Sequence, residues 1–371
     1  MFINRLENCS NKFIFSFNSQ NSKMNRIAYI DRLRVVACFA VILFHISGRC
    51  GFTFEISLEN HMTMELFHNL VLWCVPIFVM ISGALFLNPS RKINIQKLLT
   101  HNVLRIITAF LFWSFVYALY NFIGSDDPNR IRGFIIHIIG GHFHMWFLWL
   151  IVGVYLLTPI LRLISNNRRI MEYLILISIV FNFALPFLLD ITNIFIPVLR
   201  PIVRLMQSHL ANLDLQAVGG YITYFFLGYY LSSTTFDKRR VFVIIAIGLV
   251  VSIAIIGLAY MSFVKIFSSR GELLQFTSLL VMMQSVSIFL LFKKYFYNNK
   301  GGKIISFLSK YSFGIYLVHM LVIYVLVSYG VIPTFINPII GILIMSLLTL
   351  IISIGIVAII SYTPVLNKWC L

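Results

Sequence analysis

The sequence has few charged residues for a chain of 371 residues, since Asp, Glu, Lys and Arg make up only 11% of it. A soluble domain carries about a quarter of its residues as charges and about half as apolar residues. Here 60% of the residues are hydrophobic and the mean hydropathy is +0.91. This composition excludes an ordinary soluble domain.

Cysteine is also scarce, and the five residues are Cys9, Cys38, Cys50, Cys74 and Cys370. Their odd number and their spacings fit neither a disulfide framework nor a zinc site. Most of them lie in or beside apolar segments, where a free cysteine acts as a small hydrophobic side chain. We therefore expect no metal site and no cysteine chemistry.

Three further absences narrow the function. Residues 1–30 lack an apolar core followed by a cleavage site, so we expect a polar cytoplasmic segment rather than a signal peptide. The chain shows no internal repeat of the kind found in inverted-repeat transporters. No basic patch is interleaved with exposed aromatic residues, so we expect no nucleic-acid partner.

Apolar runs of about 20 residues recur along the chain, and each is long enough to cross a ~30 Å hydrocarbon core. They predict an all-α fold, a polytopic transmembrane helical bundle in the cell membrane, with one domain over residues 31–364 and a short tail over 365–371. The ten predicted spans are residues 33–52, 66–87, 104–123, 145–164, 172–190, 216–234, 241–262, 273–292, 311–330 and 339–361.

The distribution of positive charge supports this map. With the N-terminus inside, 22 of the 29 Lys and Arg residues fall on the cytoplasmic side and 7 on the outer side. Such an excess is what the positive-inside rule describes. We expect both termini in the cytosol, and we interpret the net charge of +17 as a topology signal that also favours anionic membrane lipid.

The first predicted span, "IDRLRVVACFAVILFHISG", carries ionisable side chains where lipid disfavours them. His45 lies about 21 Å along a helix from Asp31, and Arg34 and His45 are only about 20° apart around it. This stripe indicates a functional site in which Asp31 fixes Arg34 by a hydrogen-bonded ion pair. The alternative is that the arginines are ordinary flanking charges and that His45 bonds to a neighbouring helix.

Other histidines allow two interpretations each. His319, within "YSFGIYLVHMLVIY", is either a working residue or a buried histidine satisfied by a tyrosine or a carbonyl. His142 and His144 flank the fourth span beside Trp146. They either line the mouth of a site or belong to an interfacial aromatic belt.

A basic segment, "NPSRKINIQKLLTHNVLR" at residues 88–105, precedes the third span. Lys97, His101 and Arg105 are spaced i, i+4 and i+8, so an α-helix would place them near one face. These residues either orient the chain in the membrane and attract anionic lipid, or they bind a phosphate-rich cytoplasmic ligand such as a coenzyme A thioester.

Several of these segments resemble the acyltransferase-3 family of integral-membrane acyltransferases. The family's opening signature is matched by Asp31, Leu33, Arg34, Ala37, Val41 and His45. Four further segments match in order: "VPIFVMISGALFL", which contains Ser82, "HMWFLWLIVGVYLLTPIL", which contains Trp146, "YFFLGYYL", and "SFGIYLVH", which contains Tyr316 and His319. The likeness spans residues 26–320.

The resemblance implies a bundle of about ten helices that transfers an acyl group, often acetyl, from cytosolic acyl-CoA. The acceptor would be a hydroxyl of an extracytoplasmic or lipid-linked glycan. The standalone form looks most like the branch that O-acetylates surface polysaccharides in the bacterial inner membrane, including enterobacterial-common-antigen-type enzymes. No metal is implied.

The resemblance also implies roles for single residues. His45 takes the catalytic position, and Asp31 and Arg34 stand at the cytosolic mouth. The family's Arg-x-x-Arg is Asn102-Val-Leu-Arg105 here, so only Arg105 transfers as an acyl-CoA-binding residue, with Lys97 and His101 as substitutes for the missing cation. The expected pocket residues are Trp146, Ser82, Tyr316 and His319.

The chemistry of a sugar hydroxyl explains the need for a histidine. The hydroxyl is a poor nucleophile until a base takes its proton, and an imidazole titrates close to neutral pH. His45 would act as that base or carry the acyl group covalently. The alternative functions are a transporter or polysaccharide exporter with His45 as a proton relay, and an acyltransferase of the same fold that acts on a lipid, peptide or small molecule.

Overall fold

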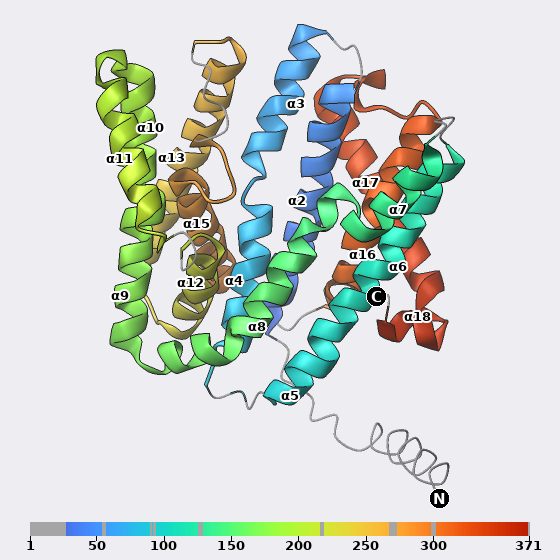
Figure 1. Cartoon of the computed structure of the whole chain (residues 1–371), viewed down its shortest axis with the longest axis horizontal. Helices are drawn as coiled ribbons and strands as arrows, with labels where there is room; N and C mark the ends of the chain where they lie inside the picture. Colours follow the sequence, from blue (N-terminus) through green and yellow to red (C-terminus); the bar gives the residue numbers. More distant parts are fainter. Residues whose placement is uncertain are drawn as a thin grey trace, which may run out of the picture.

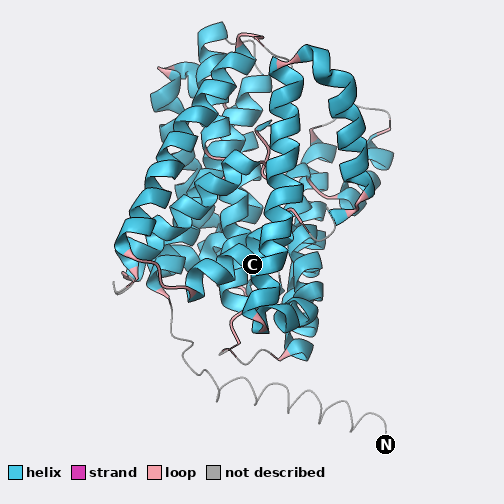
Figure 2. Ribbon diagram, turned by 90° about the vertical axis from the view of Figure 1, so that its left-hand side faces the viewer, coloured by secondary structure: helices cyan, strands magenta, loops and turns pink. Residues whose placement is uncertain are grey.

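The computed structural model describes residues 27–369, except 54–56, 90, 92–93, 125–128, 216–218, 267–272 and 298–301. The predicted N-terminal segment therefore lies largely outside the described residues, and residues 365–369 of the predicted tail belong to the short helix α18. The described part is all-helical, and its helices form one bundle (Figures 1 and 2).

The helices follow one another along the chain without any intervening strand in the described part. They are α2 (Ala28–Thr53), α3 (Leu58–Leu70), α4 (Cys74–Phe86), α5 (Ile95–Lys97), η1 (Leu98–Val103), α6 (Leu104–Ile123), α7 (Arg130–Gly140), η2 (Phe143–Met145), α8 (Trp146–Asn166), α9 (Arg168–Ser178), η3 (Ile179–Ala184), α10 (Leu185–Phe195), η4 (Pro197–Leu199), α11 (Arg200–Asn212), α12 (Tyr221–Ser233), α13 (Lys238–Phe263), α15 (Leu279–Phe296), α16 (Lys303–Ser328), η6 (Pro333–Phe335), α17 (Pro338–Ser361) and α18 (Pro364–Trp369).

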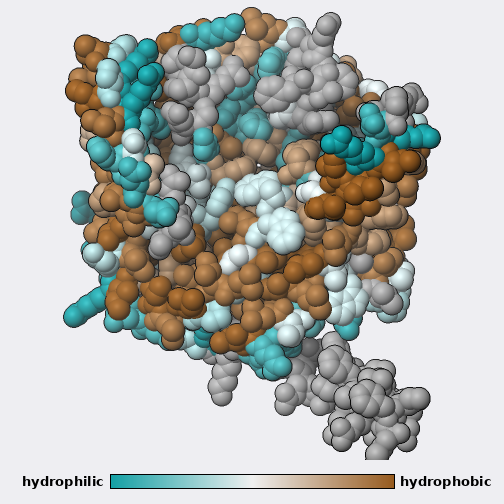
Figure 3. Space-filling model, viewed as in Figure 1, coloured by the Kyte–Doolittle hydropathy of each residue, from teal (hydrophilic) through white to brown (hydrophobic). Residues whose placement is uncertain are grey.

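The predicted fold class is confirmed, because eight helical segments of the described part are long and apolar enough to cross a membrane. The remaining two predicted spans correspond to α2, of 26 residues, and α12, of 13 residues. The latter is shorter than the ~20 residues that a full crossing requires. Apolar side chains fill most of the middle of the face in Figure 3, whereas hydrophilic ones gather toward its upper and lower edges.

Short polar side chains begin many of these helices. Each accepts a hydrogen bond from a backbone N–H of the first turn, a group that has no partner within the helix. The residues that do so are Ser57, Asn94, Asn167, Asp237, Ser278 and Asn337. Because lipid offers no hydrogen bonds, a helix that began without such a cap would leave N–H groups of its first turn unpaired. Each cap therefore helps to set the residue at which its helix begins.

Basic side chains satisfy helix carbonyls at one end of the bundle. We call this end, marked by the first residues of α2 and α16, the basal end, and the opposite end the distal end. Lys293 donates to three carbonyl oxygens at the end of α12, at 2.7, 2.9 and 2.8 Å. Arg162 donates to the carbonyls of Phe86 and Arg91 at 2.6 and 3.1 Å. Positive side chains at the basal end therefore cap helices.

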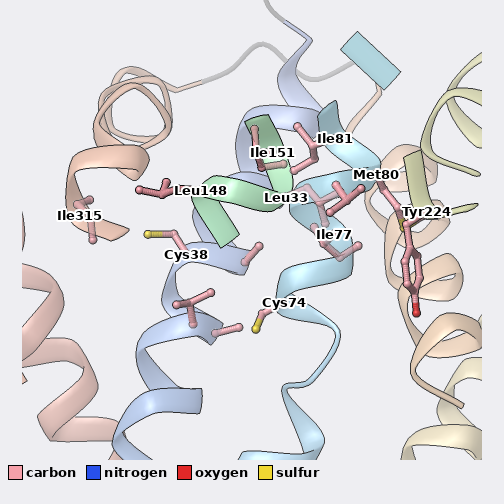
Figure 4. Close-up of a cluster of buried hydrophobic side chains, with 14 of the residues drawn as sticks. Leu33, Cys38, Cys74, Ile77, Met80, Ile81, Leu148, Ile151, Tyr224 and Ile315 are labelled. Carbon is pink, nitrogen blue, oxygen red and sulfur yellow. The ribbon is translucent and has the colours of Figure 1, made fainter. Parts of the chain in front are cut away.

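Helices α4 and α12 pack closer than side chains would allow. A Cβ on Gly83 would lie 1.8 Å from the carbonyl oxygen of Phe225, and one on Gly228 would lie 1.9 Å from that of Met80. Glycines let helix backbones approach closely in membranes, where close packing stabilises helix pairs. Figure 4 shows part of the adjoining core, whose labelled side chains come from α2, α4, α8, α12 and α16.

The segment between the fifth and sixth predicted spans contains the helix α11, which lies beside α10 (Figure 1). Two segments of the described part, η1 and η3, are π-helical turns. Such turns are rare and occur often at functional sites. The first of them, η1, contains Asn102, whose amide side chain lines the cavity described below.

We expect Gly228→Ala to destabilise the protein by about 1–3 kcal/mol, because overpacking forces α4 and α12 apart. Thermal unfolding of the detergent-purified protein measures the effect. Gly257→Ala on α13 is the matched control, since no heavy atom lies within 4 Å of its Cβ position. Equal melting temperatures for the two variants would contradict the close contact.

Candidate active site

A cavity of about 370 Å³ lies between α2, α4, α6, α8 and α16. We call it the chamber. Its basal part is lined by Arg34, Asn102, Arg105, Ser309 and Lys310. Its distal part is lined by His45, His144, Trp146 and Phe276. One cavity therefore reaches from a group of cations to a histidine.

A three-residue network stands at the basal mouth of the chamber. The Oγ of Ser309 donates to Oδ1 of Asp31 at 2.6 Å and accepts from Nη1 of Arg34 at 3.1 Å. Arg34 and Asp31 also lie within 3.7 Å of each other. The predicted ion pair between these two residues is thus present, and a serine on α16 joins it to that helix.

The ring of His45 lies at the distal part of the chamber, 11 residues beyond Arg34 on α2, or about 16 Å along the helix axis. Its ring centroid is 5.2 Å from that of His319 and 6.1 Å from that of His144. The side chain is partly buried. Three histidines from α2, α16 and η2 therefore meet at this point.

His319 is fully buried behind His45 and does not line the chamber. Its Nδ1 lies 2.6 Å from the carbonyl oxygen of Tyr316, so Nδ1 carries the proton and donates it, because a carbonyl only accepts. The neutral ring then presents a lone pair on Nε2. This atom is buried and has no hydrogen-bond partner in the described part of the chain.

His144 is 1% exposed and belongs to the chamber wall rather than to an interfacial belt. Its Nδ1 is hydrogen-bonded to Nδ1 of His142 at 2.6 Å, and Nε2 of His142 is bonded to the hydroxyl of Tyr324 at 3.0 Å. Of the two interpretations that the sequence left open, the structure favours the one in which His144 lines a site, whereas His142 contacts His144 and is not among the lining residues.

The other predicted pocket residues lie in the chamber wall. Ser82 lines it while its Oγ donates to the Phe78 carbonyl at 3.0 Å. The hydroxyl of Tyr316 donates to the backbone carbonyl of His144 and so ties α16 to η2. Trp146 stacks on Phe276, with ring centroids 5.8 Å apart and an interplanar angle of 30°.

Only one of the three predicted acyl-CoA residues of the basic segment lines the chamber. Arg105 does so, with its guanidinium 5.7 Å from the ring centroid of Phe313. Lys97 is exposed, and neither it nor His101 is among the lining residues. The prediction that Lys97, His101 and Arg105 share one face was based on a regular α-helix. Residues 98–103 instead form the π-helical turn η1, with i→i+5 hydrogen bonds, and this turn brings Asn102 to the chamber wall.

No sequence motif identified some of the residues that line the chamber. Ser309, Lys310 and Phe276 reach the chamber only because their segments pack against α2 and α8. No group of three or more His, Cys, Asp or Glu residues in the described part could hold a metal ion. The polar side chains that line the chamber are cations, hydroxyls, imidazoles, the amide of Asn102 and the thiol of Cys74.

The model of the Acyl_transf_3 family, described as "Acyltransferase domain", matches residues 27–358. The chain belongs to the acyltransferase-3 family. It is thus a multi-pass protein of a membrane acyltransferase family, and the resemblance of the individual motifs is confirmed at the level of the family.

Curated relatives of this acyltransferase-3 protein come from Staphylococcus aureus. Those of strains MSSA476, N315 and MRSA252 are each named "Probable poly-beta-1,6-N-acetyl-D-glucosamine export protein". Each is 21% identical over 303 residues, which cover 80% of this chain and 82% of the relative. No solved structure matches the chain.

We expect Ser309→Ala to destabilise the protein by about 1–3 kcal/mol, because it leaves the buried carboxylate of Asp31 without its hydroxyl donor. Thermal unfolding in detergent measures the loss. Ser306→Ala, one turn earlier on α16 and outside this network, is the control. An unchanged melting temperature for Ser309→Ala would show that the network does not hold α2 and α16 together.

Proposed function

We propose that the protein is an O-acyltransferase that moves an acyl group, most simply acetyl, from cytosolic acyl-CoA to a hydroxyl of an extracytoplasmic or lipid-linked glycan. The observation that carries the proposal is the chamber, which joins Arg34 and Arg105 to His45 in one cavity. Guanidinium groups suit phosphates. A donor whose phosphates lie at the basal mouth can extend its thioester toward the histidine.

The orientation of the protein supports this assignment of the two substrates. The basal end carries the excess of Lys and Arg, so the positive-inside rule places it in the cytosol, where acyl-CoA is found. His45 lies toward the distal end, which then faces the outer side. The donor would enter from one side of the membrane and the acceptor from the other.

The reaction proposed for His45 begins with an imidazole nitrogen that takes the proton of the acceptor hydroxyl. The oxygen attacks the thioester carbonyl, the C–S bond breaks, and the departing thiolate receives the proton. In the covalent alternative, the His45 nitrogen attacks the thioester carbonyl and the C–S bond breaks, which releases the thiolate. The acceptor oxygen then takes the acyl group from the nitrogen, and its proton goes to the thiolate. The lone pair on Nε2 of His319, beside the His45 ring, supports a positioning role for that residue.

The acceptor class is the finer part of the proposal. The motif resemblance favours the branch that O-acetylates surface polysaccharides, of the enterobacterial-common-antigen type. The names of the relatives also point to a polysaccharide, although they describe export rather than acylation. A surface glycan is therefore the acceptor that we propose for this chain.

A second candidate function is polysaccharide export, which the printed names of the relatives favour. His45 would then relay protons rather than acyl groups. The two functions differ in their product. Loss of an acyltransferase leaves surface glycan present but unacetylated, whereas loss of an exporter leaves glycan absent from the surface or retained inside.

We expect Arg105→Ala to weaken acyl-CoA binding about 10-fold to 100-fold, since hydrogen bonds to charged groups contribute about 1.5–3 kcal/mol. Calorimetry on the purified protein measures the affinity, which high salt should lower further by screening the cations that remain. Lys303→Ala, an exposed basal lysine outside the chamber, is the control. Unchanged affinity in Arg105→Ala would leave this arginine as a topology residue.

We expect His45→Ala to lower the rate of acyl transfer by at least 10²–10⁴-fold, the usual contribution of a general base, while acyl-CoA still binds. His45→Gln should be equally inactive because its amide cannot take a proton. His137→Ala, an exposed histidine of α7, is the control. Transfer is followed in vitro, and mass spectrometry of surface glycans records acetylation in cells.

Normal acetylation by a well-expressed His45→Ala variant would reject His45 as the catalyst. Glycan that disappears from the surface of cells carrying this variant, instead of losing acetyl mass, would favour the export function.

A further inference from the structure

The hydroxyl of Tyr117 takes part in the backbone hydrogen bonding of a helix other than its own. Tyr117 lies on α6, is only 2% exposed and does not line the chamber. Its hydroxyl donates to the carbonyl oxygen of Leu317 at 2.8 Å and accepts from the backbone N–H of Leu321 at 3.1 Å. Both partners belong to α16, which lies beside α6 in Figure 1. Neither the family comparison nor the motif resemblance assigns this tyrosine a role.

The two backbone groups are the ones that an α-helix joins to each other, since an N–H bonds to the carbonyl four residues earlier. The hydroxyl therefore enters one turn of the α16 hydrogen-bond ladder. A side chain that does so is one of the few causes of a local change in helix geometry. Within a membrane such an insertion is tolerated because the side chain satisfies the backbone groups. The shape of this turn thus depends on α6 as well as on α16.

The turn that the hydroxyl enters carries His319. This imidazole is fully buried, and its Nδ1 donates to the carbonyl oxygen of Tyr316, three residues earlier, at 2.6 Å. The ring is thus held to the backbone of its own helix and follows any shift of the turn. Its centroid lies 5.2 Å from that of His45. A change in the turn at residues 317–321 would therefore change how the two rings meet.

The separation of these two rings matters most after His45 has taken up a proton. His45 is then a cation, and the lone pair on Nε2 of His319 can accept a charge-assisted hydrogen bond from it. Such a bond requires the two nitrogen atoms to be about 3 Å apart. Ring centroids 5.2 Å apart allow this separation when the nitrogen atoms face each other. A small displacement of His319 would remove the stabilisation.

The ring of Tyr117 is held on its other side by the histidines that precede α8. It stacks on His142, with ring centroids 4.3 Å apart and an interplanar angle of 20°, and lies 5.4 Å from the ring of His144. Gly141, with a φ of +72°, brings the chain against α6 here, since a Cβ would lie 2.5 Å from the ring of Phe110. Tyr117 is therefore fixed by contacts with α16 and with the residues around η2.

We propose that Tyr117 is a positioning residue of the acyl transfer, whose hydroxyl sets the turn of α16 that holds His319 in place to stabilise protonated His45. This inference rests on the proposed function, because it assigns a partner to His45 in that reaction. Ser309 fixes α16 against α2 at the basal end, ten residues before His319, or about 15 Å along the helix axis. Tyr117 gives the same helix a second fixed point next to the reacting ring.

The first test is the kinetics of Tyr117→Phe in the full-length protein in detergent, with acetyl-CoA as donor and extracted surface glycan as acceptor. The variant keeps the stacked ring, and the freed backbone groups of Leu317 and Leu321 can bond to each other, so the protein should still fold. We expect kcat to fall about 10-fold to 100-fold, the usual effect of a small misplacement near the chemistry. KM for acetyl-CoA should stay unchanged, because Tyr117 does not line the chamber.

Tyr120→Phe is the matched control. It removes a hydroxyl from the same helix, nearly one turn later, that has no hydrogen-bond partner among the described residues. Its kcat should equal that of the wild type. A wild-type kcat in Tyr117→Phe, or a fall no larger than that in Tyr120→Phe, would overturn the proposal.

A double-mutant cycle tests whether Tyr117 acts through His319. His319→Ala should lower kcat at least as much as Tyr117→Phe does. The double variant should be no slower than His319→Ala alone, because the hydroxyl then has no imidazole to position. Two effects that multiply in the double variant would overturn the proposal, and so would a wild-type kcat in His319→Ala.

Nuclear magnetic resonance of protein with ¹⁵N-labelled histidine distinguishes failure of this proposal from failure of the proposed function, because it needs no reaction. The imidazole signals of His319, recognised by their absence from His319→Ala, should shift in Tyr117→Phe and stay in place in Tyr120→Phe. Unshifted signals in Tyr117→Phe would overturn the positioning role alone. Shifted signals in a protein whose wild type transfers no acyl group would overturn the proposed reaction and leave the hold of Tyr117 on His319 in place.

Discussion

The hydroxyl of Ser309 holds α16 against α2 by donating to Asp31 and accepting from Arg34. Each of these polar groups would be costly in lipid alone, and together they satisfy one another. The same two helices carry His45 and His319 farther along, with their ring centroids 5.2 Å apart. Because helices are rigid over this distance, the contact at the mouth helps to set the geometry at the reacting end.

The glycine contact between α4 and α12 also positions side chains that lie some distance from it. Gly83 follows Ser82 in the chamber wall, and Gly228 lies on the helix that begins with Tyr221, whose ring contacts Trp146. Backbones that touch through glycines cannot shift without a clash or a void. One packing contact therefore positions side chains in the chamber wall and beside it.

Three aromatic rings stand beside His45 at the distal part of the chamber. Trp146 contacts both Tyr221 and Phe276, with ring centroids 5.9 and 5.8 Å apart, and so forms a continuous wall with them. Aromatic rings are large and apolar, and they meet the ring edges of their neighbours in defined geometries. Such a wall can exclude water from a thioester while it leaves one polar group accessible.

Hydropathy and helical periodicity by themselves determined the class of fold, the positions of the spans and the stripe of Asp31, Arg34 and His45. These features depend on the thickness of lipid and on the geometry of a single helix. Only the tertiary structure decided which chain-distant groups meet, such as the rings of His144 and His319, because lipid-facing and helix-facing residues are alike in hydropathy. It also decided that η1 would turn Asn102 rather than Lys97 and His101 toward the chamber, since a π-helical turn departs from the period on which the sequence argument rested.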